Sequence, residues 1–230
     1  SGYPGTRYAM FFVTGPGNAY AVDAQDGKLL WRSEVKGFHN VSASSTLHNG
    51  RLYIPLAGTE TLSGANPEYE CCRSRGGVAA LDANTGTLLW KVDSIREPVR
   101  PLGDNAAGKA LWGPSGASVW NAPTVDAKRR RIYVGTGNSY GPVAADTSDS
   151  VLALDMDDGH LVWSHQEFKG DSFMVGCGPK NPPGGNCPET LGPDWDFGGA
   201  SIMLQTLANG RDVLVVAGKG GVAIALDPEN

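Results

Sequence analysis

The chain alternates short apolar runs with turn residues, and no long stretch has the three-to-four-residue apolar period of an amphipathic helix. The apolar runs are rich in β-branched and aromatic residues and are bounded by Gly, Asn or Pro, which is typical of short strands. They include residues 8–13, 51–56, 132–134 and 213–217. No run is long enough to span a bilayer as a helix. The pattern predicts an all-β fold.

A short motif recurs among these runs. An Ala-Val-Asp or Ala-Leu-Asp triplet is followed by Gly at the fourth position after the Asp and by Trp at the eighth. It occupies residues 21–31, 80–90 and 153–163, and it begins again at 225–230. The Asp can hydrogen-bond to turn backbone, the Gly supplies a positive φ, and the Trp can bury a large area between sheets. A β-sandwich would not explain this spacing.

The repeat therefore predicts a β-propeller in which each blade is a four-stranded antiparallel sheet. We interpret residues 1–230 as one partial propeller domain with about four blades of a larger ring. The repeats are farther apart than the roughly 40–50 residues that one blade needs. The excess falls in three insertions, at 59–74, 97–117 and 170–194. Long loops on a rigid scaffold are frequent places for function.

Charge and cysteine content narrow the range of functions. The formal net charge of −5 and the pI near 5.3 argue against a nucleic-acid-binding protein. The one basic run, 128–131, lies between two short strands, and we interpret it as a solvated hairpin turn. The four cysteines are close together in pairs, which suits an oxidising compartment and predicts a periplasmic or secreted protein. The sequence contains no C-x-x-C-H haem site.

Four segments carry motifs that are more specific than the repeat, which also occurs in cofactor-free propellers. They are Pro67-Glu68-Tyr69-Glu70-Cys71-Cys72-Arg73-Ser74-Arg75-Gly76, Trp120-Asn121-Ala122-Pro123 followed by Gly135-Thr136-Gly137-Asn138, Gly192-Pro193-Asp194-Trp195-Asp196-Phe197, and Ala217-Gly218-Lys219-Gly220-Gly221. In composition and order they resemble the quinoprotein alcohol dehydrogenases, which use pyrroloquinoline quinone (PQQ). The first segment and the loop between Cys177 and Cys187 resemble the polyvinyl-alcohol dehydrogenase branch of that family. The resemblance covers nearly the whole chain.

The resemblance implies a site for PQQ and Ca²⁺. Asp196 matches the catalytic base, which is also a ligand of the calcium ion. Trp120 matches the floor beneath PQQ, and Lys219 matches a cation that reaches the quinone oxygens. Asn138 matches a calcium ligand and follows Trp120 at the family's interval. An amide oxygen is a suitable hard ligand for Ca²⁺, and an indole face suits a planar quinone.

The glutamate ligand of calcium has two candidates. The family places it shortly before the Arg-Gly that corresponds here to Arg75-Gly76. Glu70 is one residue too distant from this pair, and Glu60 lies in a Gly-Thr-Glu that resembles the family's Gly-Ala-Glu. We prefer Glu70 and keep Glu60 open. Asp194 would share a face with Asp196 in an extended segment, as a second carboxylate near the metal.

The cysteine pattern of the family implies two disulfides, Cys71–Cys72 and Cys177–Cys187. Adjacent half-cystines in this family close a small ring that packs on one face of PQQ, although in methanol dehydrogenase the ring comes from an earlier segment. By the resemblance, Cys71 and Cys72 are cofactor-binding residues. The Cys177–Cys187 bridge would constrain the loop that leads to Asp196. This constraint would offset part of the entropy cost of ordering that loop.

The function implied is oxidation of a secondary or polymeric alcohol of the polyvinyl-alcohol kind, with hydride passing to PQQ and electrons to a cytochrome c or haem domain. A quinoprotein for a small alcohol or a sugar is one alternative. Another is a non-catalytic PQQ-repeat propeller that acts as a protein-binding scaffold. The chain begins and ends inside a blade, so we expect missing sequence or self-association to close the ring. A partial ring that binds nothing by itself also remains open.

Overall fold

The computed structural model describes residues 8–15, 17–35, 40–181 and 183–230. Within these ranges the chain forms strands β1 to β16 and one four-residue helix, α1, so the all-β prediction is confirmed. Every pair of adjacent strands within a sheet is antiparallel. None of the described residues belongs to a helix long and apolar enough to cross a membrane.

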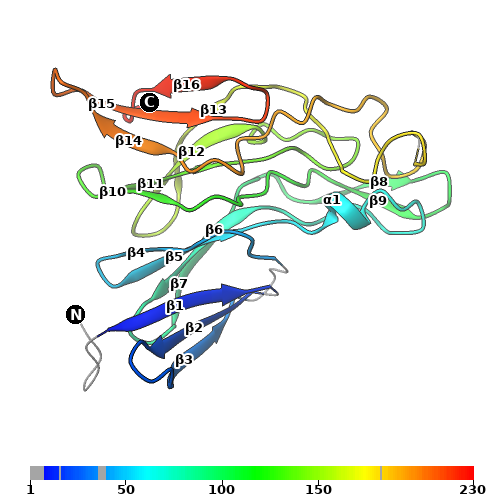
Figure 1. The fold of residues 1–230 in the computed structure, drawn as a ribbon. Helices are drawn as coiled ribbons and strands as arrows, with labels where there is room; N and C mark the ends of the chain where they lie inside the picture. Colours follow the sequence, from blue (N-terminus) through cyan, green and yellow to red (C-terminus); the bar gives the residue numbers. More distant parts are fainter. Residues whose placement is uncertain (1–7, 16, 36–39, 182) are drawn as a thin grey trace.

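Four sheets follow one another in sequence order, from the blue first sheet to the red fourth sheet in Figure 1. The first contains β1 (Ala9–Thr14), β2 (Asn18–Asp23) and β3 (Leu29–Glu34). The second contains β4 (Thr46–His48), β5 (Arg51–Leu56), β6 (Gly77–Asp82) and β7 (Leu88–Asp93). The third contains β10 (Thr124–Asp126), β11 (Arg131–Gly135), β12 (Ser150–Asp155) and β13 (Leu161–Gln166). The fourth contains β14 (Met203–Thr206), β15 (Asp212–Ala217) and β16 (Ala223–Leu226).

These sheets are blades of a partial propeller, and they do not close into a ring within the described residues. Two of the four have the predicted four strands, whereas the first and last have three, because no further described segment pairs with them. The insertions add α1 (Glu60–Ser63) and a hairpin of β8 (Arg100–Asp104) and β9 (Ala110–Gly113). In Figure 1 both lie at the same side of the stack of sheets.

The turns of the repeat have the predicted chemistry. A carboxylate oxygen of Asp82 accepts hydrogen bonds from two turn amides, and Asp23 and Asp155 do the same for at least one turn amide each. The glycine of each turn has a φ between +73° and +77°, at Gly27, Gly86 and Gly159. This left-handed conformation favours glycine, since a Cβ is strained there.

The tryptophans of the repeat join neighbouring blades in an equivalent way. Each indole nitrogen donates to a carbonyl in the next repeat: Trp31 to Ala83 at 3.0 Å, Trp90 to Met156 at 3.3 Å, and Trp163 to Pro228 at 3.2 Å. A Cβ added at Gly86 would lie 2.6 Å from the ring of Trp31, and one at Gly159 would lie 2.6 Å from the ring of Trp90. Gly86 and Gly159 are therefore required for space between blades as well as for their φ.

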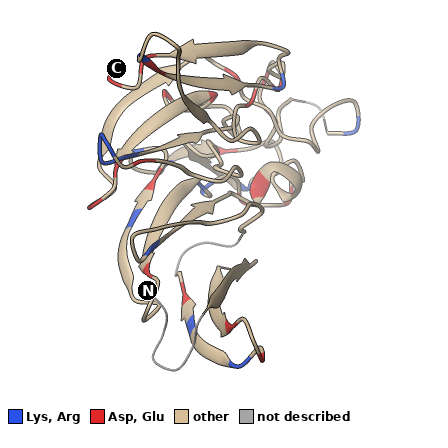
Figure 2. Ribbon diagram, turned by 60° about the vertical axis from the view of Figure 1, so that its left-hand side comes forward, with Lys and Arg blue, Asp and Glu red and all other residues tan. Residues whose placement is uncertain are grey.

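The basic run 128–131 is only partly the solvated turn that the sequence suggested. Lys128 and Arg130 are exposed, but the Arg129 side chain is 12% exposed and pairs with Asp126, Asp212 and Glu229. These contacts raise the pKa of Arg129 and tie the third blade to the fourth. Figure 2 shows the charged residues largely on loops and strand ends. Arg131 also bonds to the Pro228 carbonyl and pairs with Glu229, so two arginines of the run reach the fourth repeat, a role that local sequence does not reveal.

Candidate functional site

A cavity of about 250 Å³ contains the four residues predicted to form the core of the site: Trp120, Asn138, Asp196 and Lys219. They come from loops that follow different strands and are far apart in the sequence. The remaining wall is formed by Asn40, Ser42, Ala57, Gly58, Thr61, Ser118, Gly137, Tyr140, Phe173, Val175 and Asp194. The fold therefore brings three of the four motifs to one cavity.

Backbone hydrogen bonds hold these three motifs side by side. The Phe197 amide donates to the Thr136 carbonyl at 3.1 Å, which joins the Asp196 segment to the Gly-Thr-Gly-Asn turn after β11. On the other side, the Lys219 amide donates to the Asp196 carbonyl at 3.1 Å. Asp196 thus lies between the two other motifs, and its backbone is fixed on both sides. Asp194 and Asp196 both have positive φ, at +59° and +38°, so the segment is bent rather than extended.

Trp120 is supported by glycine backbone. A Cβ at Gly199 would lie 2.7 Å from the six-membered ring of the indole, and a Cβ at Gly198 would overlap its pyrrole edge. The Trp120 amide also donates to the Gly198 carbonyl at 3.2 Å. The residue is nevertheless 36% exposed, and it lines the cavity. The indole is therefore a supported platform, and the two glycines directly after the Trp-Asp-Phe motif are site residues that the sequence reasoning missed.

Lys219 links the carboxylates to the platform. Its Nζ lies 2.9 Å from Oδ1 of Asp194, 2.9 Å from Oδ2 of Asp196, and 5.3 Å from the centre of the Trp120 ring. Burial of the ammonium lowers the pKa of Lys219, but its hydrogen bonds to the two carboxylates outweigh this effect, so the pKa lies above its usual value. A positive charge is therefore held beside the indole at neutral pH.

Two buried carboxylates accept hydrogen bonds from Asn138 and from the Asp196 backbone. Asp171 accepts a 2.8 Å hydrogen bond from Nδ2 of Asn138, and Asp149 accepts one of 3.0 Å from the Asp196 amide. Both acids are 0% exposed. Burial, and next the charge of Asp171, raise the pKa of Asp149 to about 8. This pair could not be identified from the sequence, because neither acid lies in one of the four motifs.

A hydroxyl pair forms another part of the wall. The hydroxyls of Tyr140 and Ser118 lie 2.8 Å apart, and Oγ of Ser118 accepts a hydrogen bond from the Gly58 amide at 2.9 Å. Burial raises the pKa of Tyr140 to about 12, so the phenol stays protonated and can donate. A Cβ at Gly58 would lie 3.0 Å from the Tyr140 ring and 2.8 Å from Oγ of Ser74. The Gly58 backbone thus separates this cavity from a second cavity beside it, and it forms a partition that a side chain would not fit.

The two glutamate candidates lie on the far side of that partition. Glu60 and Glu70 both line a neighbouring cavity of about 500 Å³. Glu60 is buried, and its carboxylate accepts hydrogen bonds from the amides of Arg73 and Ser74 and from the Tyr69 hydroxyl. The Glu70 side chain is 60% exposed and pairs with Arg73. Glu60 is thus the buried candidate, and its chain neighbour Thr61 lines the first cavity, whereas the Glu70 side chain is largely exposed.

The structure contains both disulfides predicted from the family pattern, Cys71–Cys72 and Cys177–Cys187. Cys71 and Cys72 are fully buried and pack in a cluster with Ala65, Tyr140, Met174 and Cys187. Among the described residues, the wall of the Trp120 cavity does not include the Cys71–Cys72 pair. It lies behind Tyr140, so packing of this disulfide on a bound cofactor remains a prediction that the present geometry does not favour.

The residues that line the Trp120 cavity suit PQQ and Ca²⁺. An amide and a carboxylate, from Asn138 and Asp196, are the oxygen donors that Ca²⁺ prefers. An indole that is backed by glycine and open on the cavity side suits a planar aromatic molecule.

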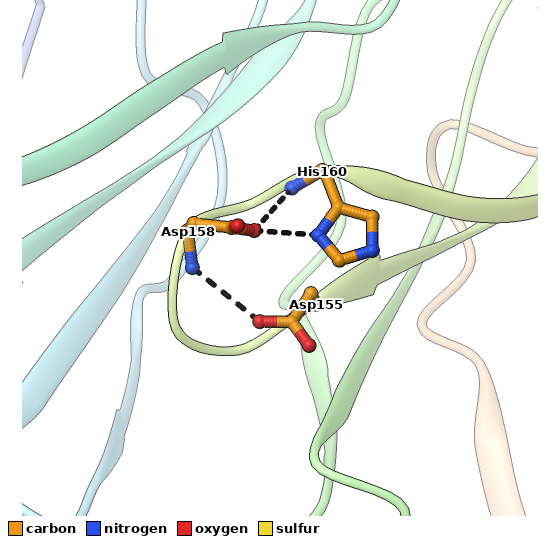
Figure 3. A group of neighbouring side chains, drawn as sticks. All are labelled: Asp155, Asp158 and His160. Atoms are coloured by element: carbon orange, nitrogen blue, oxygen red, sulfur yellow. Dashed lines mark hydrogen bonds and ion pairs between the residues drawn. The ribbon is translucent and has the colours of Figure 1, made fainter.

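A separate cluster of possible metal ligands is explained by the repeat. Ligand atoms of Asp155, Asp158 and His160 lie within 4.8 Å of one another in the turn between β12 and β13. Figure 3 shows these side chains bonded within their own turn: Asp155 accepts from the Asp158 amide, and Asp158 accepts from the amide and Nδ1 of His160. The Asp of the other repeats bonds in the same way. The cluster is a turn structure.

Comparison with known families gives two matches. Residues 59–175 match the PQQ family, described as the β-propeller domain of glucose, ethanol and alcohol dehydrogenases. Residues 1–107 match the family of the outer membrane protein assembly factor BamB. The first match contains the Glu60, Trp120 and Asn138 motifs, whereas the second ends before the Trp120 segment.

Several proteins of similar sequence are alcohol dehydrogenases. A polyvinylalcohol dehydrogenase from Sphingopyxis sp. is 43% identical over 227 residues, which cover 97% of this chain and 34% of that protein. A polyvinylalcohol dehydrogenase from Pseudomonas sp. is 40% identical over 226 residues, which cover 97% of this chain and 35% of that protein. The crystal structure of quinohemoprotein alcohol dehydrogenase from Comamonas testosteroni has a TM-score of 0.64 and 24% identity over 96% of this chain and 32% of that one. The chain spans about a third of the length of these relatives.

Proposed function

This chain belongs to the PQQ β-propeller family of glucose, ethanol and alcohol dehydrogenases, and on that premise we propose that it carries the cofactor site of a PQQ-dependent alcohol dehydrogenase. The observation that supports the proposal most is the convergence of Trp120, Asn138, Asp196 and Lys219 on one cavity. A propeller that served only as a scaffold would need the Asp–Gly–Trp repeat, but it would not need these four side chains together.

Trp120 would hold the cofactor ring, with Gly198 and Gly199 supporting the indole from behind. Asn138 and Asp196 would hold Ca²⁺, with Glu60 as a third ligand in preference to Glu70. When bound, PQQ and Ca²⁺ supply the hydride acceptor and a Lewis acid. The chain's own residues then orient the alcohol, accept its proton and hold a positive charge beside the indole.

Asp196 is placed to act as the base. Its Oδ1 accepts a hydrogen bond from the Gly198 amide at 2.5 Å, and its Oδ2 pairs with Lys219. These two contacts fix the carboxylate in one orientation at the cavity wall, and general base catalysis needs a fixed acceptor within reach of the hydroxyl proton. Lys219 would stabilise negative charge that develops on oxygen atoms beside the Trp120 face.

We propose a secondary or polymeric alcohol of the polyvinyl-alcohol kind as the substrate, because two relatives with that name are 40% and 43% identical to nearly all of this chain. Electrons would pass to a cytochrome c or haem domain, since other relatives are named quinohemoprotein alcohol dehydrogenases. Two disulfides suit a periplasmic or secreted location. Closure of the ring by further sequence or by self-association remains part of the proposal.

The test begins with metal-free protein, to which PQQ and Ca²⁺ are added while absorbance and tryptophan fluorescence are recorded. We expect both signals to saturate, and we expect polyvinyl alcohol to be oxidised in preference to ethanol or glucose with an artificial electron acceptor. Asp196→Asn should keep PQQ binding and lower turnover by about 10²–10⁴-fold. Asp26→Asn, in an exposed turn, is the matched control and should leave both unchanged.

Failure of the unmodified protein to bind PQQ in the presence of Ca²⁺ would contradict the proposal. It would favour the alternative of a non-catalytic, protein-binding propeller, which the match of residues 1–107 to the BamB family also fits. If the protein prefers ethanol or glucose to the polymer, the proposed dehydrogenase activity stands and the proposed substrate is wrong.

A further inference from the structure

A single oxygen of a buried acid contacts both metal-binding segments of the proposed site. Oδ2 of Asp171 accepts a 2.8 Å hydrogen bond from Nδ2 of Asn138 and another of 2.8 Å from the Trp195 amide, one residue before Asp196. Asp171 lies in the insertion after β13, outside the motifs that suggested the site. It is 0% exposed, so it reaches these groups from inside the protein.

The contact decides which end of the Asn138 amide faces the cavity. The oxygen and nitrogen of an Asn side chain are nearly equivalent in shape, so only their hydrogen-bond partners distinguish them. The Trp195 amide can only donate, and it bonds to the same Oδ2 atom, so this oxygen serves as an acceptor and the group of Asn138 that faces it is the NH₂. Asp149 provides a second, longer acceptor on the same side, 3.5 Å from Nδ2. The Oδ1 atom is therefore the end of the amide that neither acid engages, in a residue that lines the cavity.

The position of Asp171 is itself fixed by backbone. The Ser139 amide, next to Asn138, donates to the Asp171 carbonyl at 3.1 Å, and the Phe173 amide donates to the Ser139 carbonyl at 3.0 Å. The Gly192 amide closes the base of the long loop by donating to the Ser172 carbonyl at 3.0 Å. A Cβ at Gly192 would overlap the Asp171 carboxylate. The chain thus leaves room for this carboxylate and for no side chain beside it.

The arrangement is costly for stability. A buried carboxylate without a cationic partner loses its hydration, and here a second one, Asp149, is close by. Among the described residues, Oδ1 of Asp171 has no hydrogen-bond partner. An apolar or amide side chain would fill the same space at lower electrostatic cost. Buried polar groups that are only partly satisfied call for an explanation, and a role at the neighbouring site supplies one.

We propose that Asp171 is a positioning residue that sets the Asn138 carbonyl oxygen as a metal ligand and, through the Trp195 amide, aligns the Asp196 segment with it. This inference rests on the proposed function for the identity of the metal, but the orientation of Asn138 does not depend on it. Partners that orient metal ligands typically contribute about 10- to 100-fold to metal affinity.

Asp171→Asn is the informative variant. It keeps the size of the side chain but replaces the carboxylate acceptor of Asn138 and of the Trp195 amide by a weaker amide acceptor, so the Asn138 side chain is held less firmly. The matched control is Asp126→Asn, which changes another buried acid, one that bonds to Arg129 and Tyr133 and does not touch Asn138. It reports the general effect of losing a buried carboxylate.

Two measurements separate this inference from the proposed function. The first uses metal-free protein: hydrogen exchange of the Asn138 side-chain amide, followed by NMR and assigned with Asn138→Asp. We expect slow exchange in the unmodified protein and in Asp126→Asn, and exchange at least several-fold faster in Asp171→Asn. Equal exchange in all three proteins would overturn the inference, whether or not Ca²⁺ binds.

The second measurement is calorimetric titration with Ca²⁺ alone. We expect Asp171→Asn to weaken binding roughly 10- to 100-fold and Asp126→Asn to leave it unchanged. If the unmodified protein binds no Ca²⁺, the proposed function fails, and the exchange data still decide the orientation of Asn138. If Asp171→Asn binds Ca²⁺ as tightly as the unmodified protein, Asp171 does not position a ligand and the inference is wrong.

Discussion

The Nζ atom of Lys219 lies 2.9 Å from Oδ2 of Asp196, and the two residues come from segments joined by a hydrogen bond between the Lys219 amide and the Asp196 carbonyl. The pair is therefore fixed by backbone as well as by charge. It places a cation and a potential base side by side beside the Trp120 ring. This relationship leads to the first of four predictions.

Replacement of Lys219 by Met should lower turnover of the PQQ-loaded protein by about 10²–10³-fold, because a charge aimed at developing negative charge is lost. The free energy of unfolding should fall by about 1–3 kcal/mol, since the Asp196 side chain is 4% exposed and loses its cationic partner. Lys219→Arg should keep most of the activity. Turnover with an artificial acceptor and urea denaturation measure the two effects. Lys28→Met, at an exposed pair with Asp26, is the control, and an equal loss there would contradict the prediction.

Gly199→Ala should weaken PQQ binding without unfolding the protein. Its Cβ would lie 2.7 Å from the Trp120 ring, so the indole must tilt into the cavity or move away from its support. We expect at least a several-fold increase in the dissociation constant, measured by quenching of tryptophan fluorescence. Ser201→Ala, at an exposed position two residues later, should bind PQQ normally. Unchanged affinity in Gly199→Ala would show that Trp120 is not the platform.

Two glycines of the repeat form a matched pair for stability. Gly27 and Gly159 have nearly the same φ, +74° and +77°, but only Gly159 touches a neighbouring blade, at the ring of Trp90. Gly27→Ala should lower the free energy of unfolding only by the strain of a positive φ. Gly159→Ala should lower it by about 1–3 kcal/mol more, because the added methyl group overpacks the interface between blades. Calorimetric unfolding of both variants gives the difference. Equal melting temperatures would mean that the Trp–Gly contact does not stabilise the blades.

Asp149 makes the stability of metal-free protein depend on pH. Its pKa is near 8 in the folded protein and about 3.9 in an unfolded chain, so the folded state binds more protons between these values. The stabilisation linked to this proton is complete below about pH 4 and is lost as the pH rises through 8. Asp149→Asn should therefore raise the melting temperature relative to the unmodified protein more at pH 8.5 than at pH 5. A difference that is independent of pH would argue against a protonated Asp149.

Local sequence was sufficient for the features that repeat. The Asp–Gly–Trp spacing predicted the turns, which depend on residues close together in the chain, and the inter-blade tryptophans, whose contacts recur because the motif recurs. The order of the family motifs predicted that Trp120, Asn138, Asp196 and Lys219 would meet. Gly198 and Gly199 were visible in the sequence, directly after Phe197, but their purpose depends on where Trp120 lies.

Other features depend on long-range packing and could not be predicted. Asp171 looks like any loop acid until the fold brings it to Asn138. The different burial of Glu60 and Glu70, on which the preference for Glu60 as a ligand rests, was not visible either, since both acids lie in one insertion. Placement of the Cys71–Cys72 pair behind Tyr140 depends on the later loop that carries Met174.

The contacts of Gly86 and Gly159 with the tryptophan of the preceding repeat also bear on how such propellers can change. Both contacts pair the same two residue types at the same distance, so a blade that carries the motif can follow another blade that carries it. A substitution at either glycine would act first on the ring of the preceding blade. The glycine of one repeat and the tryptophan of the repeat before it must therefore change together.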